Sequence, residues 1–241
     1  IFIDAPTDII KLTANDMELG IDTIIEGDII QKGVIAIDAK IFSEIVRKLP
    51  DNEITIESDR NLQTMITCEK AKFSISAKSG EDFSYLPYIE KAESITLSQF
   101  TLKELIRQTI FSIADNDSNK LMTGELFEID ENILKVVSLD GHRKTELTKN
   151  YQTRKVVVPG KTLVEVSKIL SGEADSTVCL SFTDNHVVFE FDNTVVVSRL
   201  IEGEYFRIDQ MLSSDYETKV IIHKKELLDC IDRANLLIKN F

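Results

Sequence analysis

The sequence has 241 residues, of which 43% are hydrophobic and 29% charged, and its formal net charge at pH 7 is −13. This composition is ordinary for a globular protein and provides enough chain for one large or two ordinary domains. No apolar run approaches the ~18 residues of a membrane span, and no signal peptide precedes the first apolar segment. The acidic balance argues against a nucleic-acid partner, because phosphate-binding proteins usually carry a basic surplus, so the distribution of charge decides that question.

The chain begins with Ile rather than Met, inside a strand-like pattern, so we expect the sequence to be a piece of a longer protein. Cys68, Cys179 and Cys230 are odd in number, and no two of them have metal-ligand spacing. Each lies in an apolar pattern, which predicts three reduced core residues in a cytosolic protein.

The first ninety residues predict several strands and one helix. Residues 39–49 (AKIFSEIVRKL) have helical spacing of apolar residues, with Asp38 as the N-cap and Pro50 as the stop. Residues 79–87 (SGEDFSYLP) are rich in turn formers and predict a linker between domains. Strands are expected at 1–3, 9–14, 18–25, 34–37, 53–57, 63–68 and 72–77.

The pattern then starts over. Helices are expected at 101–112, 161–170 and 224–239. Strands are expected at 94–97, 121–128, 133–137, 145–148, 156–158, 177–182, 186–190, 194–200 and 220–222.

Three overlays of the chain on itself agree on one period. Shifts of 121, 125 and 124 residues superimpose, respectively, 39–49 on 160–170, 97–107 on 222–232, and the strand before Asp16 on the strand before Asp140. This predicts an internal repeat, each unit packing two amphipathic helices on a large antiparallel sheet, so the expected fold class is α+β. The predicted domains are 1–90 (incomplete at its N-terminus), 91–216 (complete) and 217–241 (the start of a third).

The charges are distributed unevenly. Helical segments 39–49, 101–112, 160–170 and 223–240 together hold eleven Lys and Arg against six Asp and Glu, and the rest of the chain holds seventeen against thirty-five. Two interpretations stay open, since any amphipathic helix can show lysine on its outer face. If the helices share one face, that face is positive on a negative body and suits phosphates without reading bases.

Nothing in the sequence predicts catalysis. It contains no G-x-S-x-G motif, no phosphate-binding Gly-rich loop and no cluster of His, Cys and carboxylates at ligand spacing. His142, His186 and His223 are far apart, and the many Asp and Glu residues are expected to be solvated surface. We therefore expect no enzyme, no cofactor and no metal.

Residues 138–146 (SLDGHRKTE) follow the apolar strand 133–137. The order Asp140-Gly141-His142-Arg143 predicts a turn that presents a cation at a strand end, since glycine accepts positive φ and Asp can bond the backbone two residues on. Taken alone, such a turn most often only reverses the chain.

In its context, 137–144 (VSLDGHRK) resembles the strand–turn signature of the bacterial β sliding clamp family, the processivity subunit of DNA polymerase III. The segments 122–128 (MTGELFE), 156–170 (VVVPGKTLVEVSKIL) and 79–87 are similar to that family too, in the same order and spacing. The resemblance implies the DNA-clamp fold, in which a subunit has three similar domains with two inner helices each. It also implies that two subunits close head to tail around duplex DNA, and that parts of domains one and three are absent here.

The resemblance implies three sets of site residues. The DNA-facing cations would be Lys40, Arg47, Lys103, Arg107, Lys161, Lys168, Lys224, Lys225 and Arg233. A hydrophobic peptide-binding groove would comprise Met122, Leu139, Gly141, His142, Arg143, Phe206, Gln210 and Met211. The subunit contact of a homodimer would comprise Phe73, Ile75, Leu236 and Leu237. The sequence departs from the family pattern at Leu139, where Thr is usual, and at 205–208 (YFRI), where Phe-Pro-Asp-Tyr is common.

The partners implied by the resemblance are double-stranded DNA, the DNA polymerase III alpha subunit, the clamp loader, and other clamp-binding polymerases and repair proteins. The implied location is the cytoplasm, with no membrane contact and no cofactor. An alternative stays open, namely a non-catalytic structural or protein-interaction module that does not bind nucleic acid.

Overall fold

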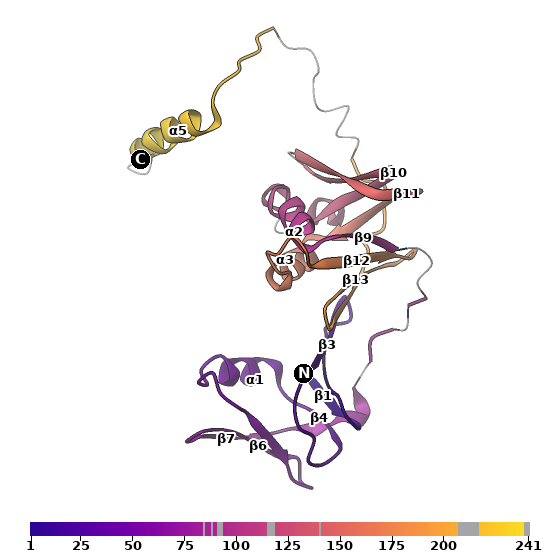
Figure 1. Ribbon diagram of the computed structural model, residues 1–241, viewed down its shortest axis with the longest axis vertical. Helices are drawn as coiled ribbons and strands as arrows, with labels where there is room; N and C mark the ends of the chain where they lie inside the picture. Colours follow the sequence, from indigo (N-terminus) through magenta and orange to yellow (C-terminus); the bar gives the residue numbers. More distant parts are fainter. Residues whose placement is uncertain are drawn as a thin grey trace. The chain divides into compact units, whose positions relative to one another are not determined.

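The computed structural model describes residues 1–83, 85–87, 89–90, 94–114, 119–139, 141–206 and 217–238 (Figure 1). The chain divides into two units, Ile1–Tyr205 and Phe206–Phe241. The domain limits expected from the repeat, after residues 90 and 216, stay predictions. None of the described helices is long and apolar enough to cross a membrane.

The first unit is built on a nine-stranded antiparallel sheet with the order β8-β4-β1-β2-β3-β14-β13-β12-β9. Its strands are β1 (Phe2–Ala5), β2 (Ile10–Asn15), β3 (Leu19–Ile25), β4 (Gly33–Ala36), β8 (Lys78–Ser79), β9 (Ser94–Ser98), β12 (Thr177–Phe182), β13 (His186–Phe191) and β14 (Thr194–Arg199). At the centre β3 pairs with β14, and the hydroxyls of Thr23 and Thr194 are hydrogen-bonded at 2.9 Å. The sheet therefore runs without a break from the first predicted repeat into the second.

Two smaller sheets complete this unit. β5 (Thr55–Ser58), β6 (Gln63–Cys68) and β7 (Ala71–Ser76) form a three-stranded sheet in which β7 is an edge strand. β10 (Gly124–Ser138) and β11 (Gly141–Pro159) form a long antiparallel hairpin.

The long hairpin corrects the sequence prediction. The strands expected at 121–128 and 133–137 are one strand, β10, which follows the 3-10 turn η3 (Lys120–Thr123), and those at 145–148 and 156–158 are one strand, β11. The polar run 130–132 resembles a turn, yet the chain absorbs it as an irregularity of register at Glu131, whose φ is +51°. In the second unit, the strand expected at 220–222 is not formed, because among the described residues it has no strand to pair with.

The helices follow the predicted spacing, with shifted ends. They are α1 (Ala39–Val46), α2 (Gln99–Arg107), α3 (Gly160–Ile169) and, in the second unit, α5 (Lys224–Ile238). The Asp38 carboxylate accepts from the Ile41 N–H at 2.9 Å, which confirms the predicted N-cap. α2 begins two residues early because Ser98 caps it, and it gives way to the 3-10 turn η2 (Ile110–Ser112). In the first unit, α1, α2 and α3 lie on the same side of the nine-stranded sheet (Figure 1).

Two hydrophobic cores anchor these helices. The smaller one joins α1 to the first strands through Ile3, Phe42, Ile45 and Ile66. The larger packs α2 and α3 against β9–β14, with fully buried members Leu102, Phe127, Leu134, Leu163, Leu180 and Phe189. All three cysteines are free thiols, and Cys68 is buried as expected. Cys179 is only partly buried, and Cys230 is exposed on α5, so the prediction of three core cysteines is wrong for Cys230.

Candidate functional site

The cations predicted to face DNA differ in whether they are paired within the protein, and those of α1 are unpaired among the described residues. Lys40 and Arg47 are exposed on α1 and its C-cap, and within the described part of the chain neither makes an ion pair. Their charges are therefore available to an external anion.

The two cations of α2 are engaged within the protein. Lys103 Nζ donates to the Leu170 carbonyl at 2.8 Å and so satisfies an acceptor at the C-terminus of α3. Arg107 makes a bidentate pair with Glu104, with Nε at 2.7 Å from one carboxylate oxygen and Nη2 at 2.8 Å from the other.

The two cations of α3 are paired as well. Lys161 Nζ donates to the Asp16 carboxylate, a contact that lowers the pKa of Asp16 and raises the pKa of Lys161. Lys168 Nζ is 2.9 Å from Glu165. Each cation on α2 and α3 thus shares its charge with an acidic or carbonyl oxygen, and the face is less positive than a count of cations suggests.

The remaining cations predicted to face DNA lie in the second unit. Lys224 and Lys225 open α5 and Arg233 lies within it, all three exposed, with Arg233 Nη2 at 3.1 Å from Cys230 Sγ. Leu236, predicted for a subunit contact, is 68% exposed. The side chain of Leu237 lies outside the described residues.

In the first unit, the other predicted contact residues lie on the edge strand β7. Phe73 is 36% exposed, and Ile75 is partly buried. An edge strand has backbone donors and acceptors available for another chain, so its position is compatible with a subunit contact.

The stretch that the sequence singled out closes the β10–β11 hairpin. Ser138 pairs with Gly141, so the chain reverses between them as predicted. His142 and Arg143, however, are not turn residues, because they pair within the ladder opposite Val137 and Val136. Both are exposed, whereas Leu139 is partly buried.

The remaining predicted groove residues belong to different parts of the chain. Met122 is partly buried on η3, and Phe206, also partly buried, begins the second unit. Gln210 and Met211 lie outside the described residues. The groove as a whole stays a prediction.

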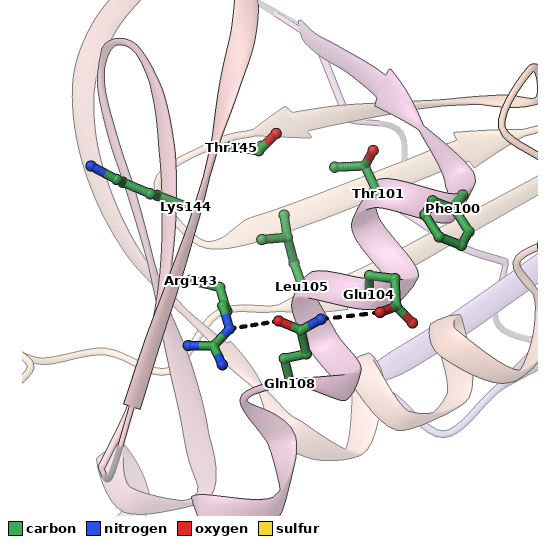
Figure 2. A pocket seen from close by; sticks show the side chains of 8 residues that line it. All are labelled: Phe100, Thr101, Glu104, Leu105, Gln108, Arg143, Lys144 and Thr145. Atoms are coloured by element: carbon green, nitrogen blue, oxygen red, sulfur yellow. Dashed lines mark hydrogen bonds between the residues drawn. The ribbon is translucent and has the colours of Figure 1, made fainter. Parts of the chain in front are cut away.

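A cavity of about 300 Å³ lies beside the hairpin, between α2 and β11 (Figure 2). Arg143, from the predicted groove, lines it, and Arg143 Nε donates to Gln108 Oε1 at 2.5 Å. Gln108 and Glu104 were missed by the sequence argument, although their spacing of four places them on one face of a helix. The lining residues are Phe100, Thr101, Glu104, Leu105, Gln108, Arg143, Lys144 and Thr145.

Glu125 is a third residue that was not predicted from the sequence. Its exposed fraction is 0%, and neither carboxylate oxygen has a hydrogen-bond partner among the described residues, so the expectation that the carboxylates are solvated is wrong here. Burial raises the pKa of Glu125 to about 8. The Thr109 hydroxyl opposes this rise, but it donates its only proton to main-chain carbonyls of its own helix, that of Leu105 at 2.8 Å. Burial, and then the nearby Glu125, raise the pKa of Tyr205 to about 12.

Among the described residues, no three His, Cys, Asp or Glu side chains are grouped closely enough to hold a metal ion.

Comparison with known proteins places two family models along the chain in succession. The N-terminal domain of the DNA polymerase III beta subunit matches residues 1–87, and the central domain of the same subunit matches residues 96–206. Beta sliding clamps from Halalkalibacterium halodurans and Bacillus subtilis are 35% and 33% identical over 95% and 98% of the chain. The chain spans 64% and 66% of the length of these two relatives.

Similar solved structures come from the same family as the matching family models and relatives. A putative DNA polymerase III beta subunit from Eubacterium rectale is 69% identical with a TM-score of 0.92, and the match covers 100% of this chain and 67% of that one. The sliding clamp of Bacillus subtilis is 33% identical with a TM-score of 0.89, over 98% of this chain and 66% of that one.

Proposed function

Since this chain belongs to the DNA polymerase III beta subunit family and has the fold of its sliding clamps, we propose that the full-length protein is a replicative processivity factor. Two copies close into a ring around duplex DNA, bind it without sequence specificity and catalyse no reaction. The proposed partners are double-stranded DNA, the DNA polymerase III alpha subunit, the clamp loader, and other clamp-binding polymerases and repair proteins in the cytoplasm.

The observation that carries the proposal is the succession of the two family matches, which together extend over 1–206 with a short interval between them. The arrangement of the first unit supports it, because α1, α2 and α3 lie on one side of a continuous sheet (Figure 1), and each of these helices carries basic residues in its sequence. A surface of this kind attracts phosphates through charge alone and lets a ring slide.

Retention on circular DNA tests the proposal. Full-length protein loaded on a nicked circle should stay bound through gel filtration and be released when the circle is cut, because only a closed ring is held by topology. The variant Leu237→Asp, which places a charge in the proposed subunit contact with Phe73 and Ile75, should be monomeric by light scattering and should not be retained. No binding to either form would favour the module that does not bind nucleic acid, and equal binding to circular and linear DNA would show that no closed ring is formed.

The proposed docking groove has its own prediction. Met122 and Met211 are expected to supply part of an adaptable apolar floor for a Leu or Phe anchor, while His142 and Arg143 form the polar rim. A peptide with a Gln-x-x-Leu-Phe-like segment should bind full-length protein with roughly micromolar affinity, as small transient interfaces do. Met122→Ala combined with Met211→Ala should weaken binding at least about tenfold, since a buried anchor contributes ~2 kcal/mol.

Isothermal titration measures the affinity, and retention on circular DNA serves as the control, which the double substitution should leave unchanged. Unchanged peptide affinity in that variant would show that the groove is assigned to the wrong residues.

A further inference from the structure

A chain of hydrogen bonds holds Arg143 to helix α2 (Figure 2). Arg143 Nε donates to Gln108 Oε1 at 2.5 Å, and Gln108 Nε2 donates to Glu104 Oε2 at 3.0 Å. Glu104 is held in turn by the bidentate pair with Arg107. Two side chains of α2, Glu104 and Arg107, and that of its C-cap residue Gln108 thus support one arginine of the predicted groove.

Only one orientation of the Gln108 amide satisfies the donors and acceptors in this series of hydrogen bonds. The hydrogen bond from Arg107 is the main cause that lowers the pKa of Glu104 to about 2, so Glu104 is an acceptor at neutral pH. A guanidinium can only donate, and a glutamine amide has one face of each kind. Glu104 therefore requires the amide nitrogen of Gln108 on its side, which turns the amide oxygen of Gln108 towards Arg143.

This arrangement matters because Arg143 is an exposed, long side chain on a strand, with many rotamers to lose on binding a ligand. Nε is fixed by Gln108, and Nη1 donates to the His142 carbonyl at 2.9 Å. Nη2 has no hydrogen-bond partner among the described residues. A guanidinium held at two nitrogens offers the third in a defined direction, which lowers the entropic cost of recognition.

We propose that Gln108 is a positioning residue of the docking groove, which aims Arg143 at an acceptor oxygen of the bound peptide; this inference rests on the function proposed above. Gln108 acts through Arg143 and contributes orientation rather than a contact with the peptide. The groove residue Arg143 on the hairpin is then supported by a residue at the end of α2, which is not among the groove residues that the family resemblance implies.

Peptide titration of full-length protein tests the inference with three variants. Gln108→Leu, which keeps the bulk but removes the acceptor, should weaken peptide binding about three- to tenfold, the effect of one lost hydrogen bond. In an Arg143→Ala background, the same change should have no further effect, because nothing is left to position. Thr145→Val, which alters the same cavity without touching the chain of hydrogen bonds, should bind like wild type.

A rescue variant separates positioning from mere stability. Combining Glu104→Gln with Gln108→Glu keeps an acceptor facing Arg143 and a donor behind it, so affinity should return to within about twofold of wild type. The inference would be overturned if the losses from Gln108→Leu and Arg143→Ala were additive in the variant that combines them. It would also be overturned if Gln108→Leu bound the peptide normally while Arg143→Ala did not. In both cases the groove assignment would remain. If Arg143→Ala itself binds the peptide like wild type, the groove assignment fails first and the inference falls with it.

Discussion

The variant Glu125→Gln is expected to gain stability relative to wild type as the pH rises, by about 3 kcal/mol between pH 5 and pH 8. The native pKa of Glu125 is raised by burial to about 8, whereas the unfolded carboxyl has its ordinary value of 4.5. Between these values the native state keeps a proton that the unfolded state has lost. Wild-type stability therefore falls through this window and levels off above the native pKa, and a neutral amide removes that dependence.

Thermal unfolding followed by circular dichroism, from pH 5 to pH 8, measures the difference. At pH 5 the two proteins should be closer in stability, since a carboxylic acid and an amide are both neutral polar groups without partners in this site. Glu146→Gln, an exposed residue of the same hairpin, is the matched control and should follow wild type at every pH. A stability difference for Glu125→Gln that does not change with pH would contradict the assignment of a neutral buried acid.

The secondary structure could be predicted where the signal is local. Helix α1 follows from the spacing of Phe42 and Ile45 with a capping Asp38, and all of these contacts lie within a few residues. The long hairpin could not be predicted in the same way. Residues 130–132 carry turn-forming side chains, and only the pairing of Glu131 with Tyr151, twenty residues away, keeps them in a strand. Tertiary pairing there overrides local preference.

The candidate site likewise has a part that could be predicted from the local sequence and a part that could not. The cations of the helices are visible in the sequence, but their partners are not. Lys161 meets Asp16 from 145 residues away, and Arg143 meets Gln108 from 35 residues away. Glu125 and Glu128 look alike in the sequence, yet Glu128 is paired with Lys155, while Glu125 is buried with no hydrogen-bond partner in the part of the chain that the structure describes. Whether a charged residue is paired, exposed or buried depends on residues distant in the sequence, and the local periodicity of the sequence does not specify these.

Unlike these paired cations, Lys40 and Arg47 make no ion pair among the described residues. The second prediction with a large expected effect concerns their part in DNA retention by the full-length protein. Replacing both Lys40 and Arg47 with Glu should shorten retention on circular DNA at least about tenfold at physiological salt, because each lost phosphate contact lowers the salt slope by ~0.9 and a ring of two subunits carries every change twice. The two cations are uncompensated among the described residues, so their loss acts on the DNA interaction rather than on an internal contact. The loss should be equal for all DNA sequences.

Charge reversal at Lys161 and Lys168 should also lower retention uniformly and flatten the salt dependence, but Lys161→Glu additionally sets two carboxylates against each other at Asp16. The opposite change isolates the electrostatic term. Glu165→Gln removes the carboxylate that Lys168 now pairs with at 2.9 Å, so the lysine becomes available to phosphate and retention should lengthen with a steeper salt slope. Dissociation from nicked circles, followed by gel filtration at several salt concentrations, measures both signs. Shorter retention in Glu165→Gln, or a loss in Lys40→Glu with Arg47→Glu that depends on DNA sequence, would show that these helices do not face the phosphates.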